Sequence, residues 1–438
     1  MSARLPIYLL VGLTLATPAT AAETAPGTAA GDTRERRFIE ITPNDQVPTI
    51  RAITPIDGSN VFFLNHRGQV GVAKFSPGLS QIGWEFYSEV KLNALPSLAL
   101  GPGYSVLSAS PYELTQGFDT DRDVELDFFQ ALVREWTDRD KGVVITAGPV
   151  ADPHGRVLFA LSPHALKAGD PPKARLMAWV PATGSLIPVT ESELLIDGFA
   201  LRRDGLLATR LAMPDYTDGF FLSLTELPPP VPDKPAEAPS PMPFTLPSLI
   251  IPAEITKRDR PDQPVFFDEE GRSKLLLVCP VSHHLIEVVP EKVDGLWQGA
   301  ILLRALSPKP IYTAAAVESG LLLGGGDEGF VPLQDDPSVH RITRLDLAAD
   351  GIALAFSQPV DRYEAVKPEN YSVKAIALGG GEKTLAIQPV VESDGRHLVL
   401  RCELPGPGSV LRVVCQNLPS EKGGKLLHAS AFYTLHSR

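Results

Sequence analysis

Short apolar segments follow polar, glycine-containing turns at regular intervals along most of the chain. Two examples are DPHGRVLFALS, residues 152–162, and RRDGLLATRLA, residues 202–212. Polar turns with glycine between short apolar runs are typical of antiparallel strands joined by tight turns. The glycines of these turns are Gly58, Gly103, Gly155, Gly205, Gly271 and Gly320.

The spacing of these glycines indicates a structural repeat. Successive glycines lie 45 to 52 residues apart, except for one interval of 66 residues between Gly205 and Gly271. That interval contains the proline-rich segment 226–248, which favours an extended polyproline II conformation over sheet pairing. Treated as an insertion, it leaves a period of about 50 residues, which is typical of β-propellers. The sequence therefore predicts an all-β fold with a six-bladed β-propeller over residues 36–335. Because such turns occur in any all-β protein, another all-β arrangement remains the alternative.

One segment has a helical rather than a strand-like spacing of apolar residues. Leu126, Phe129, Leu132, Val133 and Trp136 recur at steps of mostly three to four residues. This periodicity predicts one helix or helical loop attached to the propeller.

From residue 340 onward, short apolar strands alternate with Gly, Pro and Asp turns at closer intervals, which predicts an Ig-like β-sandwich over residues 340–437. Alternation along the strands places Cys402 and Cys415 on core-facing positions. The two cysteines are expected on neighbouring strands, so a disulfide between them is one option and two free thiols are the other.

The start of the chain resembles a secretory signal. Arg4 precedes the apolar run 5–16, and the small residues of the motif Ala19-Thr20-Ala21 suit a signal peptidase. We expect residues 1–22 to be a signal peptide and residues 23–35 a flexible leader, so that the mature protein is periplasmic, secreted or held at the cell surface. The apolar run is too short to span a bilayer, and no membrane span is expected after cleavage.

Composition narrows the classes of partner. The chain has 438 residues and a formal net charge of −12, from 40 Lys and Arg against 52 Asp and Glu. This balance disfavours nucleic acid and anionic membranes as partners. The 42 prolines disfavour long helical bundles, and the three cysteines are too few for a disulfide framework or a cysteine-rich metal site.

Three stretches and the sandwich resemble the sorbosone/glucose dehydrogenase-like β-propeller family. The first stretch is YELTQGFDTDRDVELDFF, residues 112–129, and the second is GPVADPHGRVLFALS, residues 148–162. The third and most specific is HHLIEVVPEKVDGLWQGAILL, residues 283–303. Residues 347–373 are similar to the Ig-like module that follows such propellers. The resemblance implies a six-bladed propeller that holds pyrroloquinoline quinone and Ca²⁺ over its central channel.

The resemblance also implies a histidine base and arginines that bind the carboxylates of the quinone. The histidine is missing from the segment DRDKGVVITAGPV, residues 138–150. Arg202, Arg203 and Arg304 are the remaining candidates for cofactor binding. We therefore expect a degenerate member that has lost its catalytic residues and serves as a binding or scaffold module for a carbohydrate or a protein. The alternative is an active quinone- and calcium-dependent sugar dehydrogenase.

Several side chains are candidates for binding a metal or a sugar. Asp119, Asp121 and Asp123 alternate as in a calcium loop, but Val124 and Gln130 replace the Gly and Glu of an EF-hand. An acidic, solvated turn is the alternative to calcium there. Aromatic residues and one neighbouring amide could form a sugar-binding face, or pack the blades instead. These residues are Trp84, Tyr87, Trp136, Trp179, Tyr216, Trp297 and Gln298.

Overall fold

The computed structural model describes most of the chain between residues 49 and 437. The described part excludes 80–81, 89–91, 93, 96, 122–124, 135–141, 164–173, 213–218, 228–246, 260, 319, 327–328 and 378–380. The predicted signal peptide and leader therefore lie outside the described residues, as does most of the proline-rich segment. Three candidate side chains also lie outside them: Asp123, Trp136 and Tyr216.

Strands β1 to β23 form six antiparallel sheets, each built from strands that follow one another in the sequence. The first sheet contains β1 (Ile50–Pro55), β2 (Asn60–Asn65), β3 (Val70–Phe75) and β4 (Ile82–Phe86). The second contains β5 (Leu98–Leu100), β6 (Val106–Ser110), β7 (Glu113–Phe118) and β8 (Phe128–Val133). The third contains β9 (Val143–Ala151), β10 (Val157–Pro163), β11 (Ala174–Val180) and β12 (Ser185–Ser192).

The remaining sheets of this group follow the same order. The fourth contains β13 (Leu195–Leu201), β14 (Leu206–Ala212), β15 (Gly219–Glu226) and β16 (Leu249–Pro252). The short helix α1 (Ala253–Thr256) leads to the fifth, which contains β17 (Val265–Glu269), β18 (Arg272–Cys279), β19 (His284–Val293) and β20 (Leu296–Leu306). The sixth contains β21 (Ile311–Val317), β22 (Gly320–Gly325) and β23 (Phe330–Leu333).

The predicted glycine turns are confirmed. Each of the six glycines lies between the first and second strands of a different sheet, or, for Gly320, at the first residue of the second strand. Gly155 has φ of 78° and shows why glycine is used: this left-handed conformation strains residues that carry a Cβ. Each repeat of about 50 residues in the sequence therefore corresponds to one sheet.

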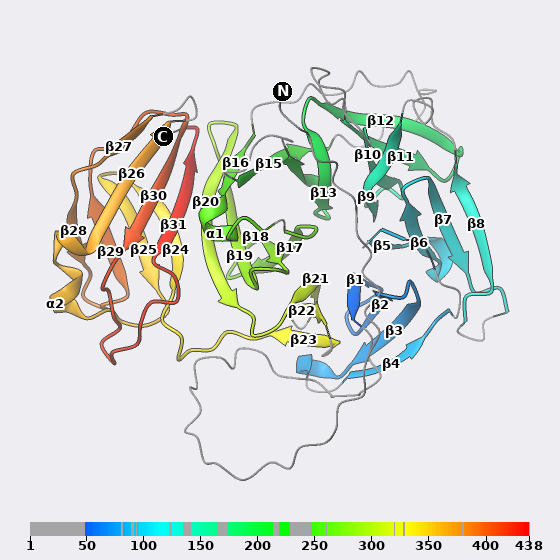
Figure 1. The fold of residues 1–438 in the computed structure, drawn as a ribbon, viewed down its shortest axis with the longest axis horizontal. Helices are drawn as coiled ribbons and strands as arrows, with labels where there is room; N and C mark the ends of the chain where they lie inside the picture. Colours follow the sequence, from blue (N-terminus) through cyan, green and yellow to red (C-terminus); the bar gives the residue numbers. More distant parts are fainter. Residues whose placement is uncertain are drawn as a thin grey trace, which may run out of the picture. The chain divides into compact units, whose positions relative to one another are not determined.

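The six sheets close into a propeller-like ring (Figure 1). The first strand of each sheet contacts the first strand of the next, and β21 contacts β1. Each pair of neighbouring sheets encloses its own hydrophobic core. Gly324 helps β22 to approach β1, because a Cβ at this position would lie 2.8 Å from Cγ2 of Ile50. Side-chain packing between sheets thus holds the ring closed.

The chain after the ring forms two further layers of strands. One layer is a four-stranded sheet of β24 (Ile342–Ala348), β25 (Gly351–Phe356), β29 (His397–Arg401) and β28 (Gln388–Val391). The other layer contains β31 (Ser430–Leu435), β30 (Ser409–Cys415), β26 (Tyr371–Ala377) and β27 (Glu382–Thr384). A short helix, α2 (Arg362–Ala365), precedes β26. A single hydrophobic core fills the space between the layers.

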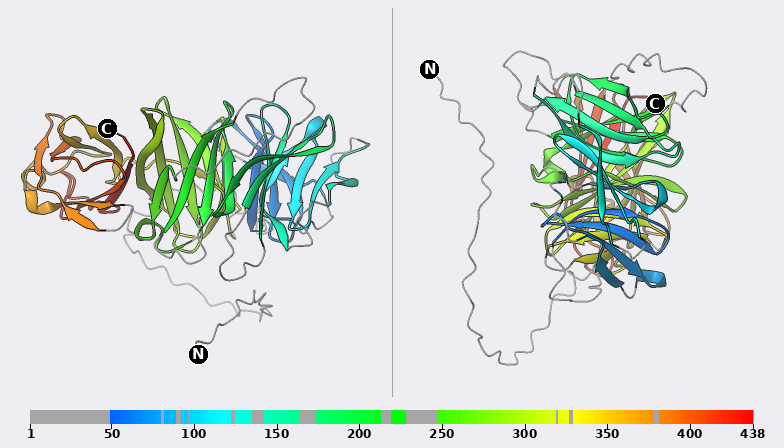
Figure 2. Two further views of the ribbon diagram at one scale, coloured as in Figure 1. Left: turned by 90° about the horizontal axis from the view of Figure 1, so that it is seen from above. Right: turned by 90° about the vertical axis from the view of Figure 1, so that its right-hand side faces the viewer.

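The second layer continues the fifth sheet of the ring. Strand β31 pairs with β20, with Gly299 opposite Thr434 and Ala300 opposite Tyr433, so that eight strands form one sheet (Figures 1 and 2). Ala300 and Leu302 of β20 belong to the core of the strand layers that follow the ring. Hydrogen bonds and shared packing therefore join the two parts, which the sequence pattern did not predict.

The helix predicted around residues 126–136 is wrong, because the described part of this segment contains the strand β8. Leu126 packs in the core between the first and second sheets, whereas Val133 packs between the second and third. Apolar residues of this segment pack into the cores on both sides of the second sheet. Their spacing along the sequence therefore resembles that of an amphipathic helix. Pairing with β7, with Phe118 opposite Phe128, favours the strand.

The expectation that Cys402 and Cys415 lie on neighbouring strands is also wrong. Cys402 follows β29 in the four-stranded layer, whereas Cys415 lies on β30 in the eight-stranded sheet. Successive strands here cross from one layer to the other. Both thiols are free, and burial raises the pKa of Cys415 to about 12.

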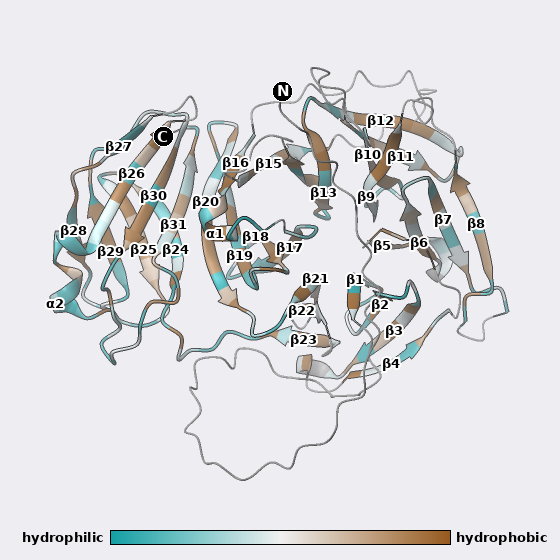
Figure 3. Cartoon of the chain, viewed as in Figure 1, coloured by the Kyte–Doolittle hydropathy of each residue, from teal (hydrophilic) through white to brown (hydrophobic). Residues whose placement is uncertain are grey.

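Hydrophobic residues are concentrated on the strands, whereas α2 and many of the turns are hydrophilic (Figure 3). Within the described ranges, no helix is long and apolar enough to cross a membrane.

Candidate functional site

Arg202 and Arg203 lie in the turn between β13 and β14. The Arg202 guanidinium donates hydrogen bonds from Nε and Nη2 to the carboxylate of Asp204, at 2.7 and 2.5 Å. It also lies 5.8 Å from the ring centroid of Phe266. The hydrogen bond to Asp204 raises the pKa of Arg202. Arg203 is exposed. Arg202 is therefore held by its own turn.

Arg304 lies in a buried ionic network, which we call the Arg304 cluster: Arg304, Glu269, Glu287, Lys274 and Asp335. Arg304 lies 2.6 Å from Glu269, 2.9 Å from Glu287 and 3.2 Å from Asp335. Lys274 contacts the same two glutamates, at 2.7 and 2.9 Å. Only 4% of the Arg304 side chain and 1% of the Glu287 side chain are exposed.

The charges of the Arg304 cluster compensate one another. Burial alone would raise the pKa of Glu269, but hydrogen bonds from Arg304 and Lys274 outweigh it and hold the pKa at about 2. Asp335 also pairs with Arg341, at 3.1 Å, in the segment that leads from β23 to β24. The cluster therefore fixes that segment to the fifth sheet.

The structure does not bring Arg202 and Arg304 together. Arg202 stacks on Phe266, whereas Arg304 stacks on Phe267 at 5.2 Å. Adjacent residues of a strand point to opposite faces, and these two phenylalanines belong to the cores on either side of the fifth sheet. Strand β17 thus separates the two guanidinium groups. They do not fit the carboxylates of a single quinone.

The acidic turn predicted as a calcium candidate is partly described. Carboxylate oxygens of Asp119, Asp121 and Asp127 lie within 4.8 Å of one another, and Asp123 lies outside the described residues. Thr120 donates a hydrogen bond from Oγ1 to Asp127 at 2.6 Å. These contacts fit the solvated turn as well as calcium, and the calcium site stays a prediction.

A second charged group lies at the centre of the ring, and we call it the ring-centre cluster: Arg51, Tyr312, Asp262, Arg210 and Asp197. Arg51 of β1 lies over the ring of Tyr312 of β21, 5.1 Å from its centroid. Arg51 is exposed, and it forms no ion pair with any residue that the structure describes. Its guanidinium is therefore accessible to a ligand.

Arg210 reaches the ring centre from the second strand of the fourth sheet. Its Nε donates to Oδ1 of Asp197 at 2.6 Å, its Nη2 to the Asp197 carbonyl at 2.8 Å and its Nη1 to the Asp262 carbonyl at 2.8 Å. Gly198 makes room for this side chain, because a Cβ there would lie 3.3 Å from Cζ of Arg210. A fixed guanidinium thus joins the fourth and fifth sheets.

Asp262 differs from Glu269 of the Arg304 cluster. Burial raises the pKa of its carboxyl group to about 6, although Arg210 and Arg51 act in the opposite direction. The residue still keeps part of its surface accessible. Carboxyl groups that titrate near neutral pH are common at functional sites. Its backbone carbonyl accepts the hydrogen bond from Nη1 of Arg210, which ties Asp262 to the fourth sheet.

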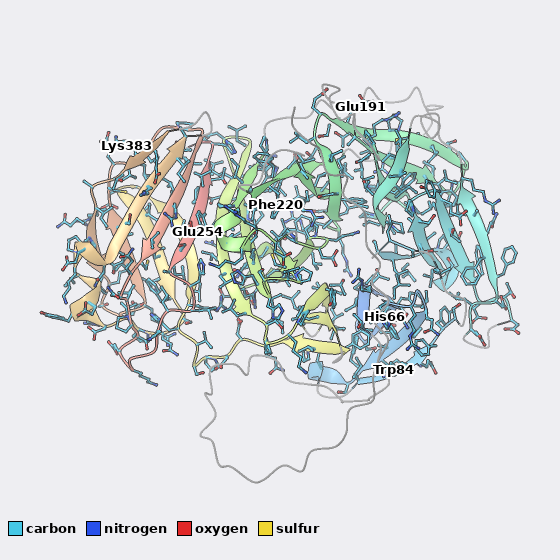
Figure 4. All side chains as sticks on the ribbon, viewed as in Figure 1. His66, Trp84, Glu191, Phe220, Glu254 and Lys383 are labelled. Atoms are coloured by element: carbon cyan, nitrogen blue, oxygen red, sulfur yellow. The ribbon has the colours of Figure 1, made fainter. Side chains whose placement is uncertain are left out.

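His66, labelled in Figure 4, adds a titratable ring beside this cluster. It lies in the turn between β2 and β3, where its backbone N–H donates to the carbonyl of Thr49. Burial, together with the charges of Arg67 and Arg51, lowers its pKa. His66 is therefore a neutral hydrogen-bonding group near neutral pH.

Sequence reasoning missed the ring-centre cluster because its members lie on three sheets and in the segment before β17, and share no motif. The available signal was the pair Asp197-Gly198 within β13, where a small residue adjoins a carboxylate. The aromatic candidates that the structure describes contribute to packing. Trp179 is buried in a core, Trp297 lies under Lys292 at 5.7 Å, and Trp84, labelled in Figure 4, contacts Phe63 edge-on.

The sequence matches no family model, and no curated protein sequence is similar to it. Solved structures are similar in chain path. A luciferin-regenerating enzyme is 14% identical over 67% of this chain and 93% of that chain, with a TM-score of 0.44. A glucose dehydrogenase is 13% identical over 66% and 97%, with a TM-score of 0.44. The soluble aldose sugar dehydrogenase of Escherichia coli is 10% identical over 65% and 95%, with a TM-score of 0.43. Two of these three structures are sugar dehydrogenases.

Proposed function

We propose that this chain is an exported six-bladed β-propeller with an Ig-like sandwich, and that it binds a small carbohydrate at the ring-centre cluster. The observation that carries the proposal is that Arg51 of β1 lies over Tyr312 of β21 and is close enough to act electrostatically on Asp262, which precedes β17. Guanidinium and carboxylate groups bind the hydroxyl groups of sugars, and aromatic side chains line their sites. The proposal makes the protein a binding module rather than an enzyme.

The positions of the predicted cofactor residues support a binding module over a quinone-dependent enzyme. Arg202 and Arg304 are each committed to acidic partners on opposite sides of β17. A quinone with several carboxylates needs cations that converge on it. At the ring centre, Arg210 is already bound to Asp197.

The alternative function is an active quinone- and calcium-dependent sugar dehydrogenase. One observation favours it: Asp262, with a pKa of about 6, is able to accept a hydroxyl proton at neutral pH. A bound quinone would accept the hydride. This function requires high affinity for the quinone and reduction of a dye in the presence of sugar.

The test is calorimetric titration of the purified chain with a panel of neutral and acidic sugars, and separately with pyrroloquinoline quinone and Ca²⁺. We expect saturable binding of a sugar and no binding of the quinone. Asp262→Asn should weaken sugar binding about tenfold, the effect of one charge-assisted hydrogen bond. Arg203→Ala is the matched control, because Arg203 is exposed in a turn at the other end of the strands, and it should leave the affinity unchanged.

Two outcomes contradict the proposal. Micromolar or tighter binding of the quinone by the folded chain would favour the dehydrogenase. If the chain, shown to be folded by circular dichroism, bound none of the sugars in the panel, the proposed carbohydrate ligand would be wrong.

A further inference from the structure

A separate cavity lies beside α1, where the ring meets the strand layers that follow it. It is open to solvent, has a volume of about 500 Å³ and is lined by Pro252, Ala253, Glu254, Lys257 and Arg258. Figure 4 labels Glu254 close to β20 and β31. None of the lining residues belongs to the ring-centre cluster.

The carboxylate of this cavity is already neutralised. Glu254 pairs with Arg412 of β30 at 2.7 Å and accepts a hydrogen bond from Oγ of Ser430 at 2.7 Å. Burial opposes ionisation, yet these contacts lower the pKa of Glu254. Glu254 therefore serves to join α1 to the strand layers, and its charge is not available to balance other cations.

The two cations of the cavity have no such partner. Lys257 and Arg258 are exposed, and neither forms an ion pair within the described part of the chain. Both adopt the left-handed conformation, with φ of 55° and 61°. Residues with a Cβ rarely adopt it, and glycine or asparagine would be less strained there. Lys257 is the C-cap of α1, and the left-handed conformation ends the helix there.

Two histidines lie near α1, although neither lines the cavity. The rings of His284 and His428 lie 6.2 Å apart, and the Nδ1 of each contacts a backbone carbonyl. Neither Nε2 has a hydrogen-bond partner among the residues described. Burial lowers the pKa of both rings, and Lys257 acts in the same direction. At neutral pH these rings are uncharged donors or acceptors near the cations.

We infer that this cavity binds a small anionic ligand, a carboxylate or a phosphate group, through Lys257 and Arg258. The guanidinium of Arg258 and the ammonium of Lys257 supply charge-assisted hydrogen bonds. Pro252 and Ala253 supply an apolar wall for the uncharged part of the ligand. These two cations, which form no ion pair within the described part of the chain, favour an anion even though the whole chain carries a formal net charge of −12. The inference is independent of carbohydrate binding at the ring centre.

The test uses glycine substitutions, because glycine removes each charge and also adopts a positive φ without strain. The probes are D-galacturonate and inorganic phosphate, with neutral D-galactose as the reference, titrated calorimetrically at low ionic strength. We expect Lys257→Gly and Arg258→Gly each to weaken anion binding about tenfold while the thermal midpoint stays equal or rises. Binding of only one of the two anions would identify the carboxylate or the phosphate as the recognised group.

Two control variants separate this site from other effects. Lys383→Gln removes an exposed charge on β27, far along the chain from α1, and should leave anion binding unchanged (Figure 4). Arg51→Ala should also leave it unchanged, since Arg51 belongs to the ring centre. A folded chain that binds neither anion would overturn the inference. So would Lys257→Gly and Arg258→Gly variants that bind anions as tightly as the parent.

A pH series gives a second readout. An anion held by Lys257 and Arg258 would lie near His284 and His428 and favour their protonated forms, so binding of D-galacturonate, which stays ionised throughout, should strengthen as the pH falls from about 7 to about 5.5. The charged groups that face these rings are Lys257, Asp259 and Glu254. Of these, only Lys257 is changed in the variants, and Lys257→Gly should retain the pH dependence of the residual binding. Binding that is independent of pH would place the anion elsewhere.

Discussion

The Arg304 cluster and the ring-centre cluster both combine arginines with acids, yet their charges are balanced differently. In the Arg304 cluster, Arg304 contacts three acids, and the pKa of Glu269 is held at about 2. In the ring-centre cluster, Arg51 forms no ion pair within the described chain, and the pKa of Asp262 rises to about 6. Compensated charges stabilise the fold, whereas uncompensated, accessible charges are available to a ligand.

Removing the arginine of the compensated cluster should give the largest effect. Arg304→Ala leaves Glu287, which is 1% exposed, with Lys274 as its remaining cation. Loss of one partner from a buried ionic network costs about 3–5 kcal/mol. We expect the free energy of unfolding, measured by urea denaturation, to fall by that amount. A fall below about 1 kcal/mol would show that the cluster does not fix the fold.

The carboxyl groups of the two clusters should respond to pH in opposite directions. The pKa of Asp262 is raised, so its protonated form stabilises the fold; this contribution is fully present below about pH 3.8 and is lost as the pH rises through about 6. Asp262→Asn should therefore raise the free energy of unfolding by about 1–2 kcal/mol at pH 8, allowing for its partial exposure, and leave it unchanged below pH 4.

Glu269 provides the matched comparison. Its pKa is lowered, so its stabilising contribution is present above about pH 4.5 and is lost as the pH falls through about 2. Glu269→Gln should lower stability at pH 7 and flatten the acid limb of the stability curve. If the free energy of unfolding of the two variants changed with pH in the same way, the proposed difference in charge balance between the clusters would be wrong. Urea denaturation at a series of pH values measures both.

The turn around Arg202 should give the smallest effect. The Arg202 side chain is 27% exposed and that of Asp204 is 58% exposed. Exposed ion pairs contribute about 0.2–1 kcal/mol, so Arg202→Ala should lower the free energy of unfolding within that range. Sugar binding should not change. A tenfold loss of sugar affinity in this variant would show that Arg202 belongs to the sugar-binding site.

The sequence predicted much of the ring because each repeat encodes its own turn. Gly155 and Gly271 illustrate this: both have positive φ, and each begins a hairpin whose strands are close in sequence. The pairing of β20 with β31 could not be predicted in the same way. It depends on two strands whose paired residues, Ala300 and Tyr433, are far apart in the chain.

The candidate site was less predictable than the fold for the same reason. Arg202 and Arg304 could be named from a resemblance, but the side of β17 on which each lies is set by the alternation of Phe266 and Phe267. Arg51 carries no local signal, since only ring closure brings β1 next to Tyr312. Local patterns encode turns and strands, whereas convergence of side chains depends on the closed ring.

The most direct test of this account compares Arg51→Ala with Arg304→Ala in one calorimetric sugar titration, under conditions in which both variants are folded. We predict that Arg51→Ala weakens sugar binding about tenfold, with a stability change within about 0.5 kcal/mol, and that Arg304→Ala binds as the parent does. Unchanged affinity in Arg51→Ala, or an equal loss in Arg304→Ala, would contradict the division between a structural cluster and a ligand site.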